Sequence, residues 1–293
     1  MTLARRRPPV LHGLVVVDKP AGVTSHDVVA QLRRRLGERR MGHSGTLDPD
    51  ATGVLLVGVG SLTRALRFLT ELPKTYTGEV VFGVETSTLD AAGEVTARHE
   101  MGDISPADAR EVVAEHLTGT ILQVPPMVSA RRIGGRRLHE LARQGIEVER
   151  EARPVTIHRF DIDSTANPLA YRIEVQCSSG TYIRVLAADL GRLMGGGAHL
   201  RDLRRTAIGS FTEADAAPPE TAPVLPPSEA LRDYERVTVD EATAALIRHG
   251  RPLPGFPGPP PWAIVGPDGV LLAVYERDDR GEGAKPAVVL VGS

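Results

Sequence analysis

The segment Met41–Leu56, MGHSGTLDPDATGVLL, constrains this chain more than any other stretch. It places one carboxylate, Asp48, in a glycine-framed loop just before an apolar run that predicts a strand. Gly45 and Gly53 allow tight turns and close approach of a ligand, and Pro49 fixes the backbone directly after the acid. Catalytic residues often lie in loops that a rigid strand supports. An Asp before Pro is by itself more often a turn residue, so both interpretations of Asp48 stand at this point.

Length and composition limit which classes of protein this chain can belong to. The chain has 293 residues, 41% of them hydrophobic, which is enough for one large domain and a small second one. No apolar run reaches the length of a membrane span, and the Arg5–Arg7 run before two prolines makes a poor signal peptide. The single cysteine, Cys177, excludes an internal disulfide and argues against a structural zinc site. We therefore expect a cytoplasmic protein that holds no metal.

Positive charge is concentrated in the first two thirds of the chain. Residues 206–293 hold 13 acids and seven bases, a net of −6, so the total of −2 leaves +4 for residues 1–205. Three of the 35 basic residues are lysines and 32 are arginines, which suit bidentate phosphate contacts. The arginines form three clusters: Arg33, Arg34, Arg35, Arg39 and Arg40; Arg131, Arg132, Arg136, Arg137 and Arg143; Arg201, Arg204 and Arg205. The clusters favour a phosphate-binding track, with solvated helix faces as the alternative for any one of them.

Hydrophobic periodicity predicts a mixture of strands and helices in residues 1–215. Strands are expected at residues 14–18, 54–59, 74–83, 155–162 and 171–177. Helices are expected from Thr24 or Ser25 to Gly37, over residues 62–69, from Ser105-Pro106 onward, and over residues 181–194. The order lacks the alternation of a doubly wound sheet, so the expected class is α+β.

The last third of the chain differs in composition. Residues 216–234 begin with a Pro- and Ala-rich stretch and are expected to link two domains. Beyond them, residues 239–247 predict a helix, and residues 262–265, 270–275 and 287–291 predict short strands. The turn Gly266–Gly269 joins two of these strands. Residues 235–293 are therefore expected to form a small β-rich module.

Five motifs follow one another in an order that is specific to one family. They are Asp18–Ser25 (DKPAGVTS), the Asp48 loop, Lys74–Gly78 (KTYTG), Ser178–Arg184 (SSGTYIR) and Gly197–Arg205 (GAHLRDLRR). Each is moderately specific, and together they closely resemble the TruB family of RNA pseudouridine synthases over residues 10–211. The resemblance implies a catalytic domain at 1–215 with a central mixed, mostly antiparallel sheet flanked by helices. It implies a mobile RNA-clamping insertion at about 124–152, and the tail loosely resembles a PUA-type module.

The resemblance assigns the chemistry to three residues. Asp48 would add to the nucleotide or steer the cleaved base. Arg184 would keep that carboxylate ionised, since burial alone would raise its pKa; the alternative is a surface arginine on a helix. Tyr76 would stack on the extruded uracil, with an ordinary core tyrosine as the alternative.

The resemblance also assigns RNA and base contacts. His43 would support base extrusion, and Leu203 would help to wall the uracil pocket; an ordinary loop histidine and a core leucine are the alternatives. Lys19 would screen phosphate, or pair with Asp18. The insertion would bring Arg131, Arg132, Arg136 and Arg137 to the RNA, and the motif at the end of the domain would bring Arg204 and Arg205. Val128 and His139 stand where the family commonly has tyrosine, a change that we expect to affect packing or RNA contact.

The resemblance implies a cofactor-free tRNA pseudouridine synthase that flips out and isomerises the T-arm uridine at tRNA position 55. We expect the tRNA T-arm as its partner, no obligatory protein partner, and a monomer. A guide-RNA-directed synthase of the dyskerin type is one alternative, which the compact acidic tail argues against. An RNA-binding tRNA-folding chaperone is another, and the set of Asp48, Tyr76 and Arg184 argues against folding assistance as its sole role.

Overall fold

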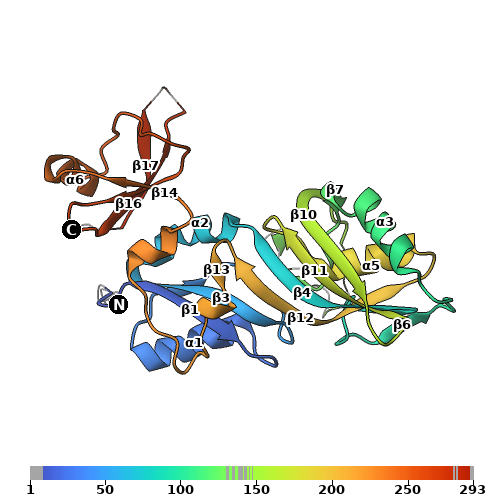
Figure 1. Cartoon of the computed structure of the whole chain (residues 1–293). Coiled ribbons are helices and arrows are strands. Elements are labelled where there is room, and N and C mark those ends of the chain that lie inside the picture. Colours follow the sequence, from blue (N-terminus) through green and yellow to red (C-terminus); the bar gives the residue numbers. More distant parts are fainter. Residues whose placement is uncertain are drawn as a thin grey trace. The chain divides into compact units, whose positions relative to one another are not determined.

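The computed structural model describes residues 9–129, 132–133, 136–137, 141, 144, 146, 148–279, 281 and 283–290. Its contacts divide the chain into two compact units. Unit 1 comprises Met1–Asp48, Val54–Glu71 and Gly209–Ser293, and unit 2 comprises Pro49–Gly53 and Leu72–Ile208. Figure 1 labels most of the helices and strands of both units, which are described separately below.

Unit 1 begins with a strand-and-helix layer. Its elements are β1 (Gly13–Lys19), α1 (Ser25–Leu36), β2 (Met41–His43), β3 (Thr52–Val59, from Val54 onward), the 3-10 helix η1 (Gly60–Ala65) and α2 (Leu66–Glu71). β1 and β2 flank β3, and β2 pairs with it in the antiparallel sense. The last seven residues of β3 are all buried, as expected for a strand covered on both faces. α1 begins at the N-cap Thr24 with a capping box to Asp27 and ends at Gly37, so the helix signals at both ends are confirmed.

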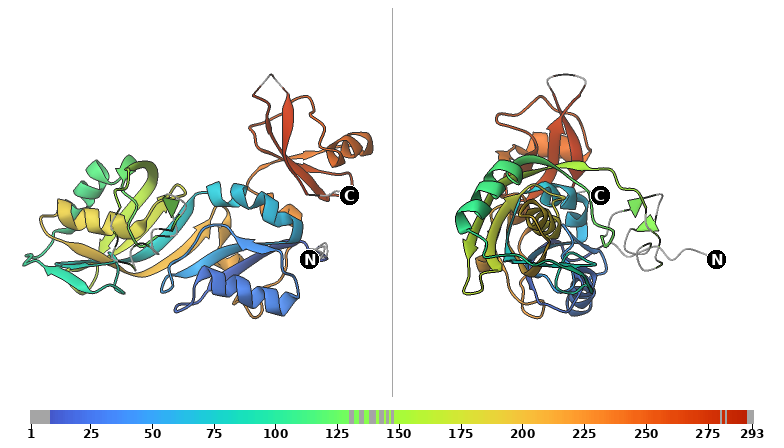
Figure 2. Two further views of the ribbon diagram at one scale, coloured as in Figure 1. Left: turned by 180° about the vertical axis from the view of Figure 1, so that it is seen from behind. Right: turned by 90° about the vertical axis from the view of Figure 1, so that its right-hand side faces the viewer.

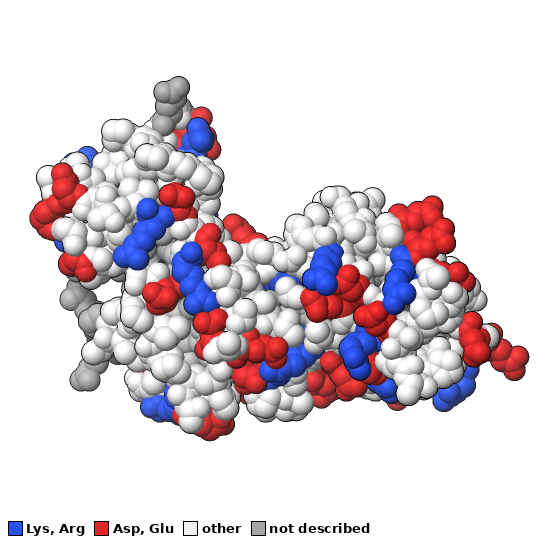
Figure 3. All heavy atoms as spheres, viewed as in Figure 1, with Lys and Arg blue, Asp and Glu red and all other residues white. Residues whose placement is uncertain are grey.

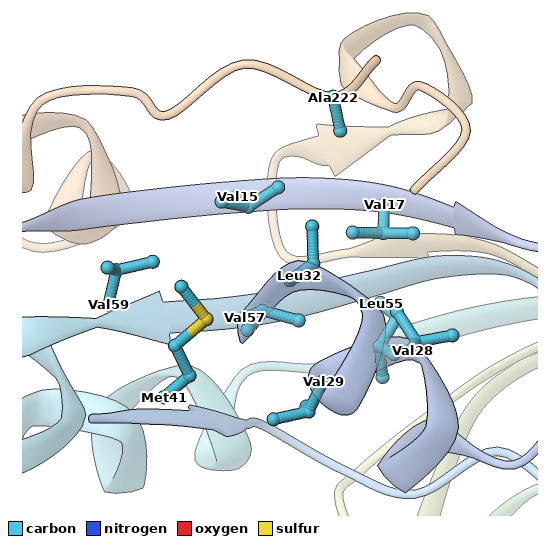
Figure 4. Close-up of a cluster of buried hydrophobic side chains, with 10 residues drawn as sticks. All are labelled: Val15, Val17, Val28, Val29, Leu32, Met41, Leu55, Val57, Val59 and Ala222. Carbon is cyan, nitrogen blue, oxygen red and sulfur yellow. The ribbon is translucent and has the colours of Figure 1, made fainter. Parts of the chain in front are cut away.

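The core of this layer is aliphatic. Val28, Val29 and Leu32 of α1 lie against buried residues of β1, β2 and β3, and Figure 4 shows these side chains pointing toward one another. Ala222, from far along the chain, belongs to the same cluster.

Residues 216–234, which are expected to link two domains, pack onto this layer. Leu225 exchanges two backbone hydrogen bonds with Leu14 of β1, at N···O distances of 3.0 and 2.7 Å. Arg35 of α1 donates to the carbonyl oxygen of Ala222. The segment is therefore held against the first layer, and its role in linking two domains stays a prediction. Its Pro-rich composition excluded long regular elements, but extended segments can still pair and pack.

Three short elements lead from the first layer toward the C-terminal module: β13 (Phe211–Thr212), η2 (Glu213–Asp215) and η3 (Pro227–Leu231). The module itself consists of β14 (Glu235–Thr238), α6 (Glu241–Arg248), β15 (Trp262–Val265), β16 (Leu271–Arg277) and β17 (Ala284–Val289). The sheet order is β14-β15-β16-β17, so the expected small β-rich module is confirmed. Sequence reasoning missed β14 and placed the start of β17 at residue 287. Arg67 of α2 forms an ion pair with Glu276 of β16 at 2.8 Å, which joins the module to the first layer of the unit.

Unit 2 is built on antiparallel strands with two helices on one face (Figures 1 and 2). Its elements are β4 (Lys74–Phe82), β5 (Val84–Thr86), β6 (Val95–Arg98), α3 (Pro106–His116), β7 (Gly119–Gln123), β8 (Arg132–Ile133), β9 (Arg136–Arg137), β10 (Arg153–Ser164), β11 (Ala170–Cys177), α5 (Ile183–Leu193) and β12 (Ala198–Ile208). The order is β12-β4-β11-β10-β7. Thr52 and Gly53 of β3 pair in parallel with Arg204 and Arg205 of β12, so the sheet is mixed and mostly antiparallel, as predicted.

The helix-bearing face of this sheet is apolar and the opposite face is charged. In β4 the residues alternate strictly between buried and half-buried, beginning with buried Lys74. On the other face Arg201 donates two hydrogen bonds to Glu79 of β4, at 2.9 and 2.6 Å. A hollow of about 580 Å³ near Arg172 and Glu174 is likewise lined by both acidic and basic side chains. Figure 3 likewise shows acidic and basic side chains interspersed on the side it presents.

Candidate active site

The Asp48 loop lies between β2 and β3 and is closed by hydrogen bonds within unit 1. At its neck, the Ser44 amide donates to the Leu56 carbonyl at 3.0 Å. Next to the acid, the buried Ser25 hydroxyl accepts from the Leu47 amide at 2.9 Å and donates to the Leu47 carbonyl at 3.3 Å. Leu47 is itself buried and Asp48 is half-buried. A single hydroxyl therefore holds both polar groups of the residue that precedes the acid, and we call this contact the serine clasp.

The first motif supplies the serine clasp. Ser25 is the first residue of α1, so its position follows from the Thr24 cap. The turn before the cap is held by Lys19, whose ammonium donates to the carbonyls of Pro20 at 2.9 Å and Val23 at 2.7 Å. The Lys19 side chain is fully buried and braces this turn, and its expected role as a phosphate contact stays a prediction.

A pair of histidines lies at the start of the same loop. The rings of His26 in α1 and His43 in β2 make an edge-to-face contact, with centroids 5.3 Å apart and planes at 80°. His26 is exposed and His43 is half-buried. His43 is therefore anchored to α1 as well as to β2, while its assignment to base extrusion stays a prediction.

In unit 2, one row of residues crosses the sheet at the start of β3. Tyr76 of β4 pairs in register with Arg205 of β12, which pairs in turn with Gly53. A Cβ atom on Gly53 would come within 2.2 Å of the Arg205 carbonyl oxygen, and its φ is +102°. Only glycine fits there, so this motif glycine is explained by the close approach of two backbones.

The two neighbouring arginines of that row differ in exposure. Arg205 is only 1% exposed and Arg204 is half-buried. The phosphate contacts expected of Arg204 and Arg205 stay predictions. Tyr76 is 9% exposed, and its role in stacking stays a prediction.

Leu203 lies on an irregular part of β12. The register with β4 shifts between Arg201 and Arg204, and Asp202 has a φ of 53°. Such a bulge turns side chains away from the regular alternation of a strand. Leu203 is half-buried, which leaves both of its interpretations open.

Arg184 is buried at the start of α5, so the surface-arginine alternative is excluded. Its side chain is 5% exposed and lies 3.7 Å from the carboxylate of Asp90. The guanidinium also donates to the carbonyl oxygens of Val128 at 2.8 Å and Thr88 at 3.3 Å. A planar guanidinium can serve several acceptors at fixed angles, and these three acceptors fix its orientation.

The remaining predicted RNA contacts lie in the insertion. The backbones of Arg132 and Arg137 pair across the short β8–β9 hairpin. Arg131 and the side chains of Arg132, Arg136 and Arg137 lie outside the described residues. Their contacts with RNA stay predictions.

No group of three His, Cys, Asp or Glu side chains that could hold a metal is present among the described residues. In the ranges described, no helix is long and apolar enough to cross a membrane. Burial raises the pKa of the Cys177 thiol to about 11, so it stays protonated and is a poor nucleophile at neutral pH.

Comparison with known proteins decides the family. Residues 33–183 match the model of the TruB family pseudouridylate synthase N-terminal domain. Residues 184–220 match that of the tRNA pseudouridylate synthase B C-terminal domain, and residues 234–291 match that of tRNA pseudouridine synthase II, C terminal. The chain belongs to the TruB family.

Relatives in the TruB family are similar over most of the chain. The tRNA pseudouridine synthase B of Symbiobacterium thermophilum is 49% identical over 249 residues, which cover 81% of this chain and 82% of the relative. That of Nocardia farcinica is 43% identical and covers 97% and 95%, respectively. The crystal structure of a Cbf5-Nop10-Gar1 complex matches with a TM-score of 0.74 at 23% identity, covering 96% of this chain and 85% of that one. At that identity it shows a shared fold.

Sequence reasoning missed two polar contacts of this TruB-family chain. Asp90 beside Arg184 follows a turn in which Leu89 has a φ of 64°, and no pattern in the sequence signalled it. Gln123, at the end of β7, binds the backbone of Tyr182 through both atoms of its amide. It directly precedes the Pro-rich start of the insertion, and this was the only available signal.

Proposed function

We propose that this chain is a tRNA pseudouridine synthase, an isomerase that converts a uridine of tRNA to pseudouridine. The observation that carries the proposal is the Asp48 loop, whose acid is positioned by the serine clasp. Relatives named tRNA pseudouridine synthase B, with 42–49% identity over most of the chain, support the same reaction.

The reaction rearranges one nucleotide without a net change in its atoms. The bond from N1 of uracil to C1′ of the ribose breaks, the base turns, and a bond from C5 to C1′ forms. C5 loses its proton and N1 ends with one, so neither an oxidant nor an activated cosubstrate is needed. We assign Asp48 the role of the carboxylate that adds to the nucleotide or steers the freed base.

The proposal gives the buried residues of unit 2 supporting roles. Arg184 would keep the catalytic carboxylate ionised while RNA excludes water. Asp90 partly balances the buried guanidinium, at 3.7 Å, and thereby lowers the cost of keeping it charged. Tyr76 would stack on the extruded base, a contact that contributes roughly 1–3 kcal/mol for an aromatic ring on a base.

We further propose that the substrate is the T-arm uridine at tRNA position 55, reached by base flipping. Single-base chemistry in a folded RNA requires the base to leave its stack, and a stem-loop is large enough to be gripped by local arginine clusters. The chain would act in the cytoplasm, as a monomer and without a protein partner. The dyskerin-type alternative draws support only from the fold shared with the Cbf5 complexes, and the acidic tail argues against it.

The test is a reaction of purified protein with unmodified tRNA transcript in EDTA, without nucleotide. Because pseudouridine and uridine have equal mass, the product is detected by carbodiimide derivatisation or by release of tritium from C5. We expect nearly stoichiometric modification of one T-arm uridine, also in an isolated T-arm hairpin.

Asp48→Asn should abolish product while tRNA still binds, and Asp50→Asn, two residues away and exposed, is the matched control. Tight binding by the wild type without product would favour the chaperone, and a requirement for guide RNA would favour the dyskerin type.

A further inference from the structure

A second clasp lies at the start of α5. The side-chain amide of Gln123 accepts a hydrogen bond from the Tyr182 amide at 2.8 Å and donates one to the Tyr182 carbonyl at 3.1 Å. Gln123 is 2% exposed. We call this contact the glutamine clasp. It holds the peptide groups two residues before Arg184, from a residue 59 positions earlier in the chain.

The glutamine clasp gives the Tyr182 amide a partner that the helix cannot supply, whereas the Tyr182 carbonyl also accepts from the amides of Val185 and Leu186 within α5. Tyr182 is the N-cap of α5 and has no side-chain cap of its own. The amide groups at the start of a helix lack partners within the helix, and a buried one left without a partner is destabilising. Gln123 therefore fixes where α5 begins, and with it the direction in which Arg184 leaves the helix.

The same short segment also contacts Arg184 directly. Five residues after Gln123, the Val128 carbonyl accepts from the Arg184 guanidinium at 2.8 Å. Residues 123–128 thus hold Arg184 at two points, through the backbone of its helix and through its side chain. Because the second contact uses a carbonyl, the valine at a position where tyrosine is common does not remove it.

We propose that Gln123 is a positioning residue that ties the first residues of the insertion to α5 and sets the orientation of Arg184. This inference rests on the proposed function, and it adds a residue to the machinery of the reaction. Residues 123–128 lead into the arginine-rich insertion. The two contacts therefore connect the segment that would hold the RNA to the residue that would support the chemistry.

Two substitutions test whether Gln123 positions Arg184 or only supports the fold in general. Gln123→Glu keeps the shape and the acceptor, but an ionised carboxylate cannot donate to the Tyr182 carbonyl. Gln123→Met keeps the length and removes both hydrogen bonds. Gln176→Glu, on an exposed position of β11 in the same unit, is the matched control.

The measurement is the single-turnover rate at saturating tRNA, together with the Kd for tRNA. We expect both Gln123 variants to react about 10- to 100-fold more slowly, a barrier increase of about 1.4–2.7 kcal/mol. We expect their Kd to stay within about twofold of wild type, since the buried amide does not face RNA, and Gln176→Glu to match wild type. Rates within about threefold of wild type, or a loss confined to Kd, would overturn the proposal.

A double-mutant cycle gives a readout that a purely structural role would not produce. If Gln123 acts through Arg184, Gln123→Glu should add little to the loss caused by Arg184→Lys, whereas an additive loss would contradict the coupling. Should neither Gln123 variant fold, hydrogen exchange in the wild type decides, because the Tyr182 amide has no helical partner. Slow exchange supports the glutamine clasp and fast exchange overturns it. An inactive wild type would instead refute the proposed function, while leaving the exchange result intact.

Discussion

The serine clasp of unit 1 and the glutamine clasp of unit 2 make the same kind of contact, but they join residues at different separations in the sequence. Each holds the N–H and C=O of one residue close to a proposed catalytic side chain. Ser25 uses one oxygen and reaches a loop 22 residues later. Gln123 uses two atoms and reaches a helix start 59 residues later.

The difference lies in what each clasp is connected to. Ser25 belongs to the capped start of α1, a helix fixed by the aliphatic core of unit 1. Gln123 ends the terminal strand β7 of the sheet order and leads into the insertion. We infer that the acid's loop is held by the rigid part of its unit. The position of Arg184, by contrast, depends on the start of a segment proposed to meet RNA.

Among the substitutions that test this comparison, the largest effect should come from Arg184→Lys. Lysine keeps the charge, but it cannot direct planar donors at the Val128 and Thr88 carbonyls together with the Asp90 carboxylate. We expect the single-turnover rate to fall on the order of a thousandfold, a barrier increase of about 4 kcal/mol. Arg192→Lys, at the exposed end of the same helix, should be silent. A rate for the Arg184→Lys variant within about tenfold of wild type would show that charge alone suffices.

The next largest effect should come from breaking the serine clasp with Ser25→Ala. The substitution leaves the buried N–H and C=O of Leu47 without this partner, at a cost of roughly 1–3 kcal/mol. We expect the rate to fall about 30-fold if about 2 kcal/mol of that cost falls on the alignment of Asp48. Ser61→Ala, a buried serine of the same unit after β3, is the control. If Ser25→Ala lowers only the melting temperature and the folded enzyme keeps its rate, the serine clasp stabilises the fold without aligning Asp48, and its comparison with the glutamine clasp fails.

Asp90→Asn should have a smaller effect, because the amide oxygen can still accept from the Ala92 backbone. What is lost is the charge 3.7 Å from Arg184. We expect the rate to fall about tenfold, equal to about 1.4 kcal/mol, with binding unchanged. Asp163→Asn removes an exposed partner of Arg110 in the same unit and should leave the rate as it is. Equal losses in both variants would mean that Asp90 has no special relation to Arg184.

The sequence predicted the local parts of both regions. The Thr24 cap and Gly37 bounded α1 correctly, and the apolar run after Asp48 is β3. These features depend on neighbours within a few residues, so local patterns are enough to reveal them.

The parts that were missed depend on distant packing. The burial of Lys19 and Arg205 was not predicted, because exposure is decided by elements far along the chain. The glutamine clasp has no local signature, because Gln123 and Tyr182 meet only when β7 and α5 are in place. The packing of residues 216–234 on β1 was missed for the same reason, since proline content predicts irregular backbone but not what that backbone packs against.

The smallest expected effect sharpens the division between holding RNA and aligning Arg184. Arg136 and Arg137 lie in the β9 strand of the insertion, and the proposal gives them phosphate contacts. Replacing both with glutamine should weaken tRNA binding roughly fivefold. It should also make the dependence of the logarithm of the association constant on the logarithm of the salt concentration less steep, by about 1–2 in the magnitude of the slope. The rate at saturating tRNA should not change, in contrast to the Gln123 variants.

Arg248 and Arg251 of the C-terminal module, replaced together, are the control and should alter the slope less, because that module is acidic. An unchanged slope for the insertion variant would return these arginines to a solvated surface. A lower rate at saturation would show that the insertion aligns the site as well as binding RNA, and the distinction between the two roles would fail.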